Sequence, residues 1–490
     1  MSATSSAPAG ADARVRRPGV VLAVILITQL MVILDATVVN IAMPHIREAL
    51  HFSPSSLSWV QNAYALAFGG LLLLGARAGD LLGRRRVFVT GVSIFTLASL
   101  LGGLAPNAEL LLAARVLQGI GGAIAAPAAL TLLMLTYREG PERMKALGYY
   151  SLVSSGGGSV GLVLGGMLTD WASWRWGLFI NVPIGIGLVF AARRVLTETE
   201  PETGRFDVAG ALTSTLGITS LVFGFIRVAE AGWTSPEVLA AFVAGVILLA
   251  SFVLIERRVS HPIVPLRLFR SASRSTAYLT MLLVVGTMFG MFFFLTQYLQ
   301  GVLELSPLAA GLAFLPLTGL LFTASRVVPK LVARIDGAKL MLTGSTLVAL
   351  GTVWLTQLDA QSTYLADVVG PMLLFGLGAG MIFIPLVGRA ISGVAPEDSG
   401  AASGMLNVVQ QVGGALGLGI LVTIFGTASR KSTATAPRAV LVDGVHAAFV
   451  GALVYAAVSL AMIVFTVRPW TWFRSEPEPV EAPAVVDSHV

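Results

Sequence analysis

Two ionisable residues, Asp35 and Arg115, lie inside long apolar runs of this sequence. If both runs are membrane-spanning helices, a rise of ~1.5 Å per residue places the two side chains within one turn of the same depth. A nearby cation keeps a carboxylate ionised while desolvation favours its neutral form, so such a pair can couple to protons. The alternative is a buried ion pair that only fixes helix packing. We favour proton coupling, because ionisable residues within a bilayer usually serve function.

Uncharged polar residues in the apolar runs are candidates for the wall of a substrate cavity. Each one alone is more often an interhelical hydrogen bond than a ligand contact. We predict that a set from both halves of the chain lines the cavity: Asn40, Asn62, Tyr64, Gln118, Gln297, Asn407 and Gln411.

A basic loop at residues 75–86 reads GARAGDLLGRRR and follows the second apolar run. Asp80 falls where a helix should end, and because the helix dipole disfavours an anion there, we expect a compensating arginine or helix N-terminus. Gly83 permits a tight reversal of the chain. A topology signal alone would explain the arginines but not Asp80. We therefore predict a gate motif made of Asp80, Gly83, Arg84 and Arg85.

Glycines recur at intervals of four in two apolar runs, a spacing that lets another helix approach closely. We predict that they are helix-packing positions: Gly157, Gly161 and Gly165 in the first half, and Gly413 and Gly417 in the second.

The elements that would position these residues follow from composition. The 490 residues are 55% hydrophobic and 12% charged, with a mean hydropathy of +0.82 and no Cys, which excludes a soluble globule and a disulfide scaffold. Apolar runs of about twenty residues predict an all-α polytopic membrane protein. We expect fourteen spans: 19–43, 57–76, 87–104, 109–135, 145–168, 176–192, 208–226, 237–255, 276–300, 308–325, 340–357, 366–388, 400–427 and 445–467.

The distribution of Lys and Arg orients the chain. Most of the 32 basic residues fall on the side of the N-terminal tail, which predicts a multi-pass protein of the cytoplasmic membrane with both termini in the cytoplasm. Only a few fall on the other side: Arg47, Arg175, Arg227, Arg430, Lys431 and Arg438. Because the positive charge is spread over membrane loops, we expect no nucleic-acid partner.

A weak internal repeat divides the chain. Gly121 and Pro127 recur as Ala379 and Pro385, and Gly91 recurs as Gly344. Repeats of this kind are typical of transporters built from two related bundles. The predicted organisation is a cytoplasmic tail at 1–18, a six-helix bundle at 19–206, two extra helices at 207–257, a second six-helix bundle at 258–467 and a cytoplasmic tail at 468–490.

Taken together, the motifs resemble the major facilitator superfamily, and within it the 14-span drug:proton antiporters. The segment from Leu34 to Pro44 is similar to the antiporters' first-helix signature, the loop around Asp80 to the gate motif, and the segment from Arg115 to Gly119 to the fourth-helix motif. The sequence departs from the antiporter pattern at Leu162, where Pro usually follows Gly161. The resemblance implies the major facilitator fold and export of lipophilic compounds driven by protons.

We therefore predict a proton-coupled efflux antiporter for lipophilic drugs or antibiotics, which works by alternating access, acts as a monomer and needs no cofactor or metal. Asp35 would carry the proton and Arg115 would tune it. An uptake carrier or facilitator of the same fold is the alternative, kept open by Leu162. A membrane-embedded enzyme is remote, because the sequence has no acid cluster or nucleotide-binding loop.

Overall fold

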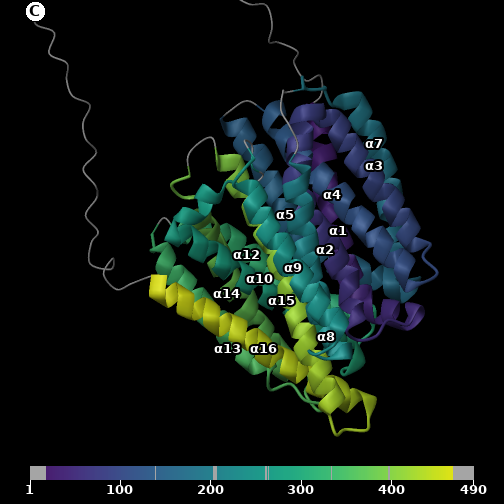
Figure 1. The fold of residues 1–490 in the computed structure, drawn as a ribbon. Coiled ribbons are helices and arrows are strands. Elements are labelled where there is room, and N and C mark those ends of the chain that lie inside the picture. The colour runs from purple at the N-terminus through teal and green to yellow at the C-terminus, as the bar shows by residue number, and fades with distance from the viewer. Residues whose placement is uncertain are drawn as a thin grey trace, which may run out of the picture.

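The computed structural model is a bundle of long helices (Figure 1) and describes residues 18–137, 140–201, 207–259, 262, 264–332, 334–394 and 398–466. Within these ranges, fourteen helical segments are long and apolar enough to cross a membrane. Apart from residue 18, both predicted tails lie outside the described residues. The first half contains α1 (Pro18–Leu50), η1 (Ser56–Ser58), α2 (Trp59–Leu82), α3 (Arg84–Gly103), α4 (Ala108–Thr136), α5 (Pro141–Trp171), α6 (Trp176–Phe179) and α7 (Asn181–Val195).

The rest of the chain continues the same pattern. It contains α8 (Val208–Ala231), α9 (Pro236–Glu256), η2 (Leu266–Arg270), α10 (Ala272–Gly301), α11 (Pro307–Ala313), α12 (Leu315–Val332), α13 (Gly337–Leu355), η3 (Tyr364–Val368), α14 (Val369–Ile391), α15 (Ser399–Lys431) and α16 (Pro437–Thr466). The sixth and tenth expected spans are each divided, into α6 with α7 and α11 with α12. The tenth is also longer than predicted, since it continues to Val332.

The internal repeat is visible in the packing. α3 crosses α4 where Gly91 meets the carbonyl oxygen of Gly121, and α13 crosses α14 where Gly344 meets the carbonyl oxygen of Gly378. Figure 1 shows α3 and α7 on one flank of the molecule and α13 and α16 on the opposite flank. The two halves of the chain therefore repeat one helix arrangement.

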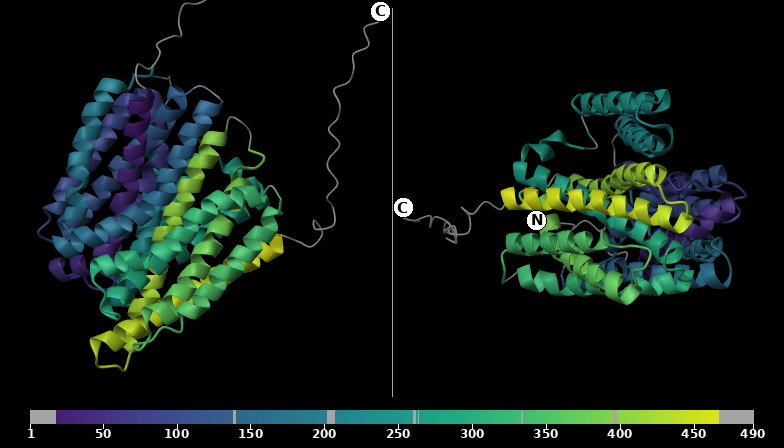
Figure 2. Two further views of the ribbon diagram at one scale, coloured as in Figure 1. Left: turned by 180° about the vertical axis from the view of Figure 1, so that it is seen from behind. Right: turned by 90° about the horizontal axis from the view of Figure 1, so that it is seen from below.

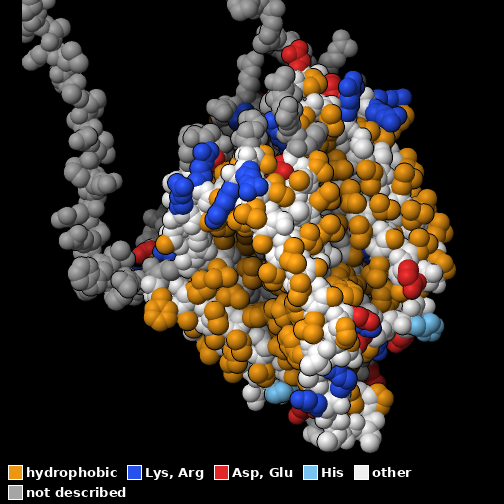
Figure 3. Space-filling view, in the orientation of Figure 1, with side chains coloured by type: hydrophobic (Ala, Val, Ile, Leu, Met, Phe, Trp, Pro, Cys, Tyr) orange, Lys and Arg blue, Asp and Glu red, His pale blue; other side chains and the backbone are white. Residues whose placement is uncertain are grey.

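The surface agrees with a membrane protein. Hydrophobic side chains cover the middle of the face seen in Figure 3, and lysines and arginines gather at its upper end. This end, called the basic end below, is where α1, α3 and α5 begin. The opposite end is called the far end. A belt of exposed apolar side chains between two polar ends is the surface that a bilayer stabilises.

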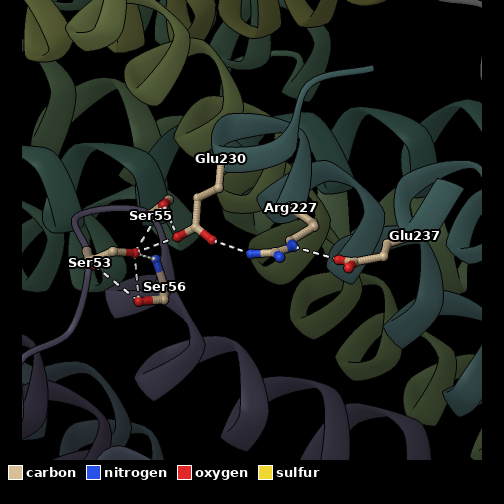
Figure 4. A network of polar contacts seen from close by, with 6 residues as sticks. All are labelled: Ser53, Ser55, Ser56, Arg227, Glu230 and Glu237. Atoms are coloured by element: carbon tan, nitrogen blue, oxygen red, sulfur yellow. Dashed lines mark hydrogen bonds and ion pairs between the residues drawn. The ribbon is translucent and has the colours of Figure 1, made fainter. Parts of the chain in front are cut away.

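The extra helices α8 and α9 stand on one face of the bundle, outside the other helices (Figure 2, right). α8 packs against α2 of the first half and α15 of the second, with Val222 and Ile226 beside Ala65, Leu66 and Ala415. A polar network at the far end adds to this contact (Figure 4): Glu230 of α8 accepts hydrogen bonds from Ser53 at 2.5 Å and Ser55 at 2.7 Å. Arg227 bridges Glu230 to Glu237 of α9. The extra helices α8 and α9 therefore cover the line along which α2 and α15 meet.

Hydrogen bonds between the two halves lie near the far end. Gln300 of α10 donates to the carbonyl oxygen of Ile41 in α1 at 2.9 Å, and Ser306 donates to the Asp170 carboxylate of α5 at 3.2 Å. Close beside the second bond, Gly166 of α5 packs directly on the backbone of Pro307. These contacts hold α1 against α10 and α5 against α11 at that end.

Candidate functional site

Asp35 lies at the centre of a buried polar cluster between α1, α4 and α7. Its side chain is fully buried, and one carboxylate oxygen accepts a hydrogen bond from Arg115 at 2.5 Å. The other oxygen accepts from the amides of Gln118 at 2.7 Å and Asn181 at 3.0 Å. The structure thus brings together the two residues whose depths match in the sequence, and three donors stabilise the carboxylate's negative charge.

Arg115 keeps further partners besides Asp35. Its Nε donates to the carbonyl oxygen of Val60 at 2.9 Å, and one terminal nitrogen also donates to Gln118 at 2.9 Å. The guanidinium lies over the ring of Tyr64, 4.5 Å from its centre. A cation held by a carbonyl, an amide and an aromatic face keeps favourable contacts even when the carboxylate becomes neutral. Arg115 is therefore stabilised by three groups besides Asp35.

The glycine stripe of α5 fits the helix that carries Asp35. A side chain at Gly157 would meet Leu30 and Ile33, one at Gly161 would meet Thr37, and one at Gly165 would meet the backbone of Val38. These positions surround Asp35 on α1, so the absence of side chains lets α5 approach it closely.

The second stripe repeats this contact in the other half. Gly413 packs against the backbone of Leu282 and Gly417 against the backbone of Gly286, both on α10. At Leu162, where the antiporter pattern has Pro, α5 continues as an unbroken helix from Pro141 to Trp171.

The predicted gate residues meet at the basic end, between α2 and α3. Asp80 accepts a hydrogen bond from Arg84 at 3.0 Å, which is the compensating arginine that its position required. Gly83 has a φ of 93°, so the reversal needs a residue without a side chain. Glu198, which was not predicted from the sequence, follows α7 and accepts hydrogen bonds from the backbone amides of Arg85 and Arg86 at 3.0 and 3.2 Å. This carboxylate caps the N-terminus of α3.

The predicted cavity residues occupy different environments. Three have buried polar atoms without a hydrogen-bond partner in the described part of the chain: both amide atoms of Asn62, the hydroxyl of Tyr64 and Oε1 of Gln297. Asn40 lies within 3.5 Å of Thr296 on α10, where the two halves meet. The buried groups with unused hydrogen-bonding capacity are the ones best suited to bind a ligand.

The remaining two cavity candidates come from α15. Gln411 packs over Gly69 of α2, and Asn407 is exposed and bonds to the carbonyl oxygen of Ser403 in its own helix. Neither is hydrogen-bonded to Asp35 within the described residues, so their place in a cavity stays a prediction.

Asn181 and Ser99 belong to the Asp35 cluster but were not predicted as site residues. Asn181 is fully buried and begins α7, and Ser99 of α3 accepts a hydrogen bond from Gln118 at 2.8 Å. Their signal in the sequence was only that of single polar residues in apolar spans, which does not specify a partner.

An ion pair in the second half was also missed. Arg267 of η2 donates to both carboxylate oxygens of Asp398 at 2.6 Å, directly before α15 begins. These hydrogen bonds lower the pKa of the Asp398 carboxyl below its usual value. The pair joins the start of α15 to the segment that precedes α10.

The fold and the buried cluster together define a membrane transporter, and comparison with known proteins specifies its family. The family model of the Major Facilitator Superfamily matches residues 25–418. A puromycin resistance protein of Streptomyces alboniger is 41% identical over 93% of this chain and 92% of its own length. A cephamycin export protein of Amycolatopsis lactamdurans is 40% identical over 89% of each chain.

A solved structure has the same fold at low sequence identity. The chain is similar to a bacterial homologue of the human lysosomal transporter Spinster, with a TM-score of 0.64, 17% identity, and coverage of 96% of this chain and 100% of the other. The protein therefore belongs to the Major Facilitator Superfamily. It is a multi-pass membrane protein and a secondary transporter, not an enzyme.

Proposed function

We propose that this protein exports small lipophilic drugs or antibiotics across the cytoplasmic membrane in exchange for protons. The single observation that carries the proposal is the Asp35 carboxylate, fully buried in an apolar bundle and held by Arg115, Gln118 and Asn181. Relatives that are resistance or export proteins for puromycin, cephamycin and lincomycin support the substrate class and the direction.

Asp35 carries the proton in this proposal. In the ionised form it accepts all three hydrogen bonds, and a proton on either oxygen weakens its pairing with Arg115. Arg115 then retains its hydrogen bonds to Val60 and Gln118 and its contact with the ring of Tyr64. Because α1 carries Asp35 and also meets α10 of the second half, a change at the carboxylate reaches the contact between the halves.

Alternating access is the transport cycle in this proposal, and the contacts between the two halves support it. The excess of arginines at the basic end supports an orientation in which the far end faces outside the cell. In this state the hydrogen bonds of Gln300 and Ser306 hold the far end closed. The drug enters from the cytoplasmic side, and Asn62, Tyr64 and Gln297 supply its polar contacts. The gate residues Asp80, Gly83, Arg84 and Arg85 stabilise one state at the cytoplasmic end. The proton gradient supplies the energy to a monomer, without a cofactor.

Transport by inverted membrane vesicles tests the proposal. Vesicles with an acidic lumen should accumulate puromycin, cephamycin or lincomycin, and a protonophore should abolish the accumulation. Asp35→Asn should remove the proton-dependent part, whereas Asp443→Asn, which alters an exposed carboxylate in the first turns of α16, should retain it. Uptake into right-side-out vesicles driven by an acidic exterior would instead support the uptake carrier.

A further inference from the structure

An apolar cavity lies between the extra helices and the two halves of the bundle. Its volume is about 330 Å³, and its wall is almost entirely apolar. Its lining comes from α2, α8, α9, α10 and α15, and includes Leu73, Ile218, Phe252, Leu282 and Val409. Small-molecule pockets in proteins are roughly 300–1,000 Å³ and mostly apolar, so this cavity falls at the lower end of that range.

The cavity lies in the half of the bundle nearer the basic end. Phe252 is four residues before the end of α9, and Ser275 and Leu279 lie in the first turns of α10. Leu279 and Phe269 on its rim are 48% and 40% exposed, so the cavity opens sideways toward the surrounding lipid. In the orientation proposed above, it faces the cytoplasmic leaflet.

One residue that lines the cavity, Tyr278, carries a hydroxyl without a partner in the described part of the chain. The hydroxyl of Tyr278 is buried without a hydrogen bond in the described part of the chain, and the residue is only 4% exposed. A buried tyrosine hydroxyl usually has a hydrogen-bond partner, and leaving one unsatisfied is costly. A ligand in this cavity should therefore be mainly apolar and carry an acceptor oxygen near Tyr278.

The cytoplasmic rim is positively charged. Arg257 and Arg258 directly follow α9, and Arg270 ends η2 next to the lining residue Phe269. All three are exposed, and no ion pair to them is seen among the described residues. Basic clusters at the cytoplasmic ends of membrane helices attract anionic lipid head groups.

We propose that this cavity binds an anionic phospholipid of the cytoplasmic leaflet. One acyl chain fills the apolar space, an ester carbonyl accepts a hydrogen bond from Tyr278, and the head group lies on the arginines of the rim. Since the wall includes α2 of the first half and α10 and α15 of the second, the lipid contacts both halves and the extra pair. This site is separate from the Asp35 cluster.

Photolabelling tests this site in the full chain without drug or pH gradient, so its outcome is independent of the transport proposal. The protein is reconstituted with phosphatidylglycerol or phosphatidylcholine that carries a diazirine in the same acyl chain, and labelled peptides are mapped by mass spectrometry. We expect labelling of α8 and α10 around the cavity, several-fold stronger with phosphatidylglycerol. Equal labelling by the two lipids would overturn the assignment of an anionic lipid.

Three variants locate the site. Ser214→Trp fills the cavity and should reduce labelling at least fivefold, while Leu212→Trp, on an exposed part of the same helix, should leave it unchanged. Tyr278→Phe removes no hydrogen bond within the protein and should weaken lipid retention about two- to tenfold. Unchanged labelling in both Ser214→Trp and Tyr278→Phe would refute the site. So would loss of the label on addition of puromycin, which would assign the cavity to the transported compound.

Discussion

Neutralising Asp35 and Arg115 together distinguishes a proton carrier from an ion pair that only supports the structure. The side chains are 0% and 1% exposed, so Asp35→Asn alone leaves a buried cation without its counterion. Removing one partner of a buried pair typically costs about 3–5 kcal/mol of unfolding free energy. We expect the lower end of that range, because Arg115 retains Val60, Gln118 and the ring of Tyr64.

The reverse change, Arg115→Gln, leaves a buried carboxylate that can take up a proton. Its cost should therefore also be moderate. The double variant Asp35→Asn with Arg115→Gln has no charge in the cluster and should recover most of the lost stability, since replacement of a whole buried pair is often neutral. Neither single variant nor the double variant should exchange drug for protons.

Two measurements on the same samples decide between the interpretations. Thermal unfolding in detergent reports stability, and drug accumulation in vesicles with an imposed pH gradient reports coupling. Recovered stability without recovered coupling is the result expected of a proton carrier. A double variant that regains both would show that the pair serves only to hold α1 against α4, and the mechanism proposed here would be wrong.

Three further predictions concern the surrounding structure. Gly165→Val should force α5 away from α1 and lower the free energy of unfolding by about 1–3 kcal/mol. Gly158→Val should be tolerated, because a side chain there meets no neighbour within 4 Å. Thermal unfolding and transport rate are measured for both variants, and equal effects would contradict the close packing. Glu198→Gln should weaken the cap of α3 by about 0.5–2 kcal/mol, measured as a lower midpoint of unfolding, and an unchanged midpoint would remove that role. The hydrogen bonds from Arg267 lower the pKa of Asp398 from its ordinary 3.8, so this pair stabilises the fold above that pH and the benefit disappears as the pH falls through the lowered value. Asp398→Asn should therefore unfold at a lower temperature than the unchanged chain at pH 7, with the difference closing in strong acid; a difference that persists there would contradict the assignment.

The sequence was sufficient for the pairing at the centre of the site. Asp35 and Arg115 are rare charges in apolar runs, and helix rise alone placed them at one depth. The glycine stripes could also be recognised in the sequence, because a spacing of four residues places the glycines on one face of a helix, whichever helix packs against it. The partner helix, α1, could be known only from the structure.

Other contacts had no comparable local signal. Glu198 caps a helix that begins more than a hundred residues earlier, so no motif connects the two. Asn181 reaches Asp35 because the start of α7 packs against α1, an arrangement that hydropathy does not predict. The cavity beside Tyr278 depends on how far α8 and α9 stand from the bundle, a distance that hydropathy does not encode.

Drug-driven proton movement in proteoliposomes tests the role of Asp35 most directly. The purified protein is reconstituted with a pH-sensitive dye in the lumen and no initial pH gradient, and puromycin is then added outside. We predict that protons move opposite to the drug in the unchanged protein, and that Asp35→Asn moves no protons while the control Asp443→Asn does. Proton movement of normal size in Asp35→Asn would contradict it.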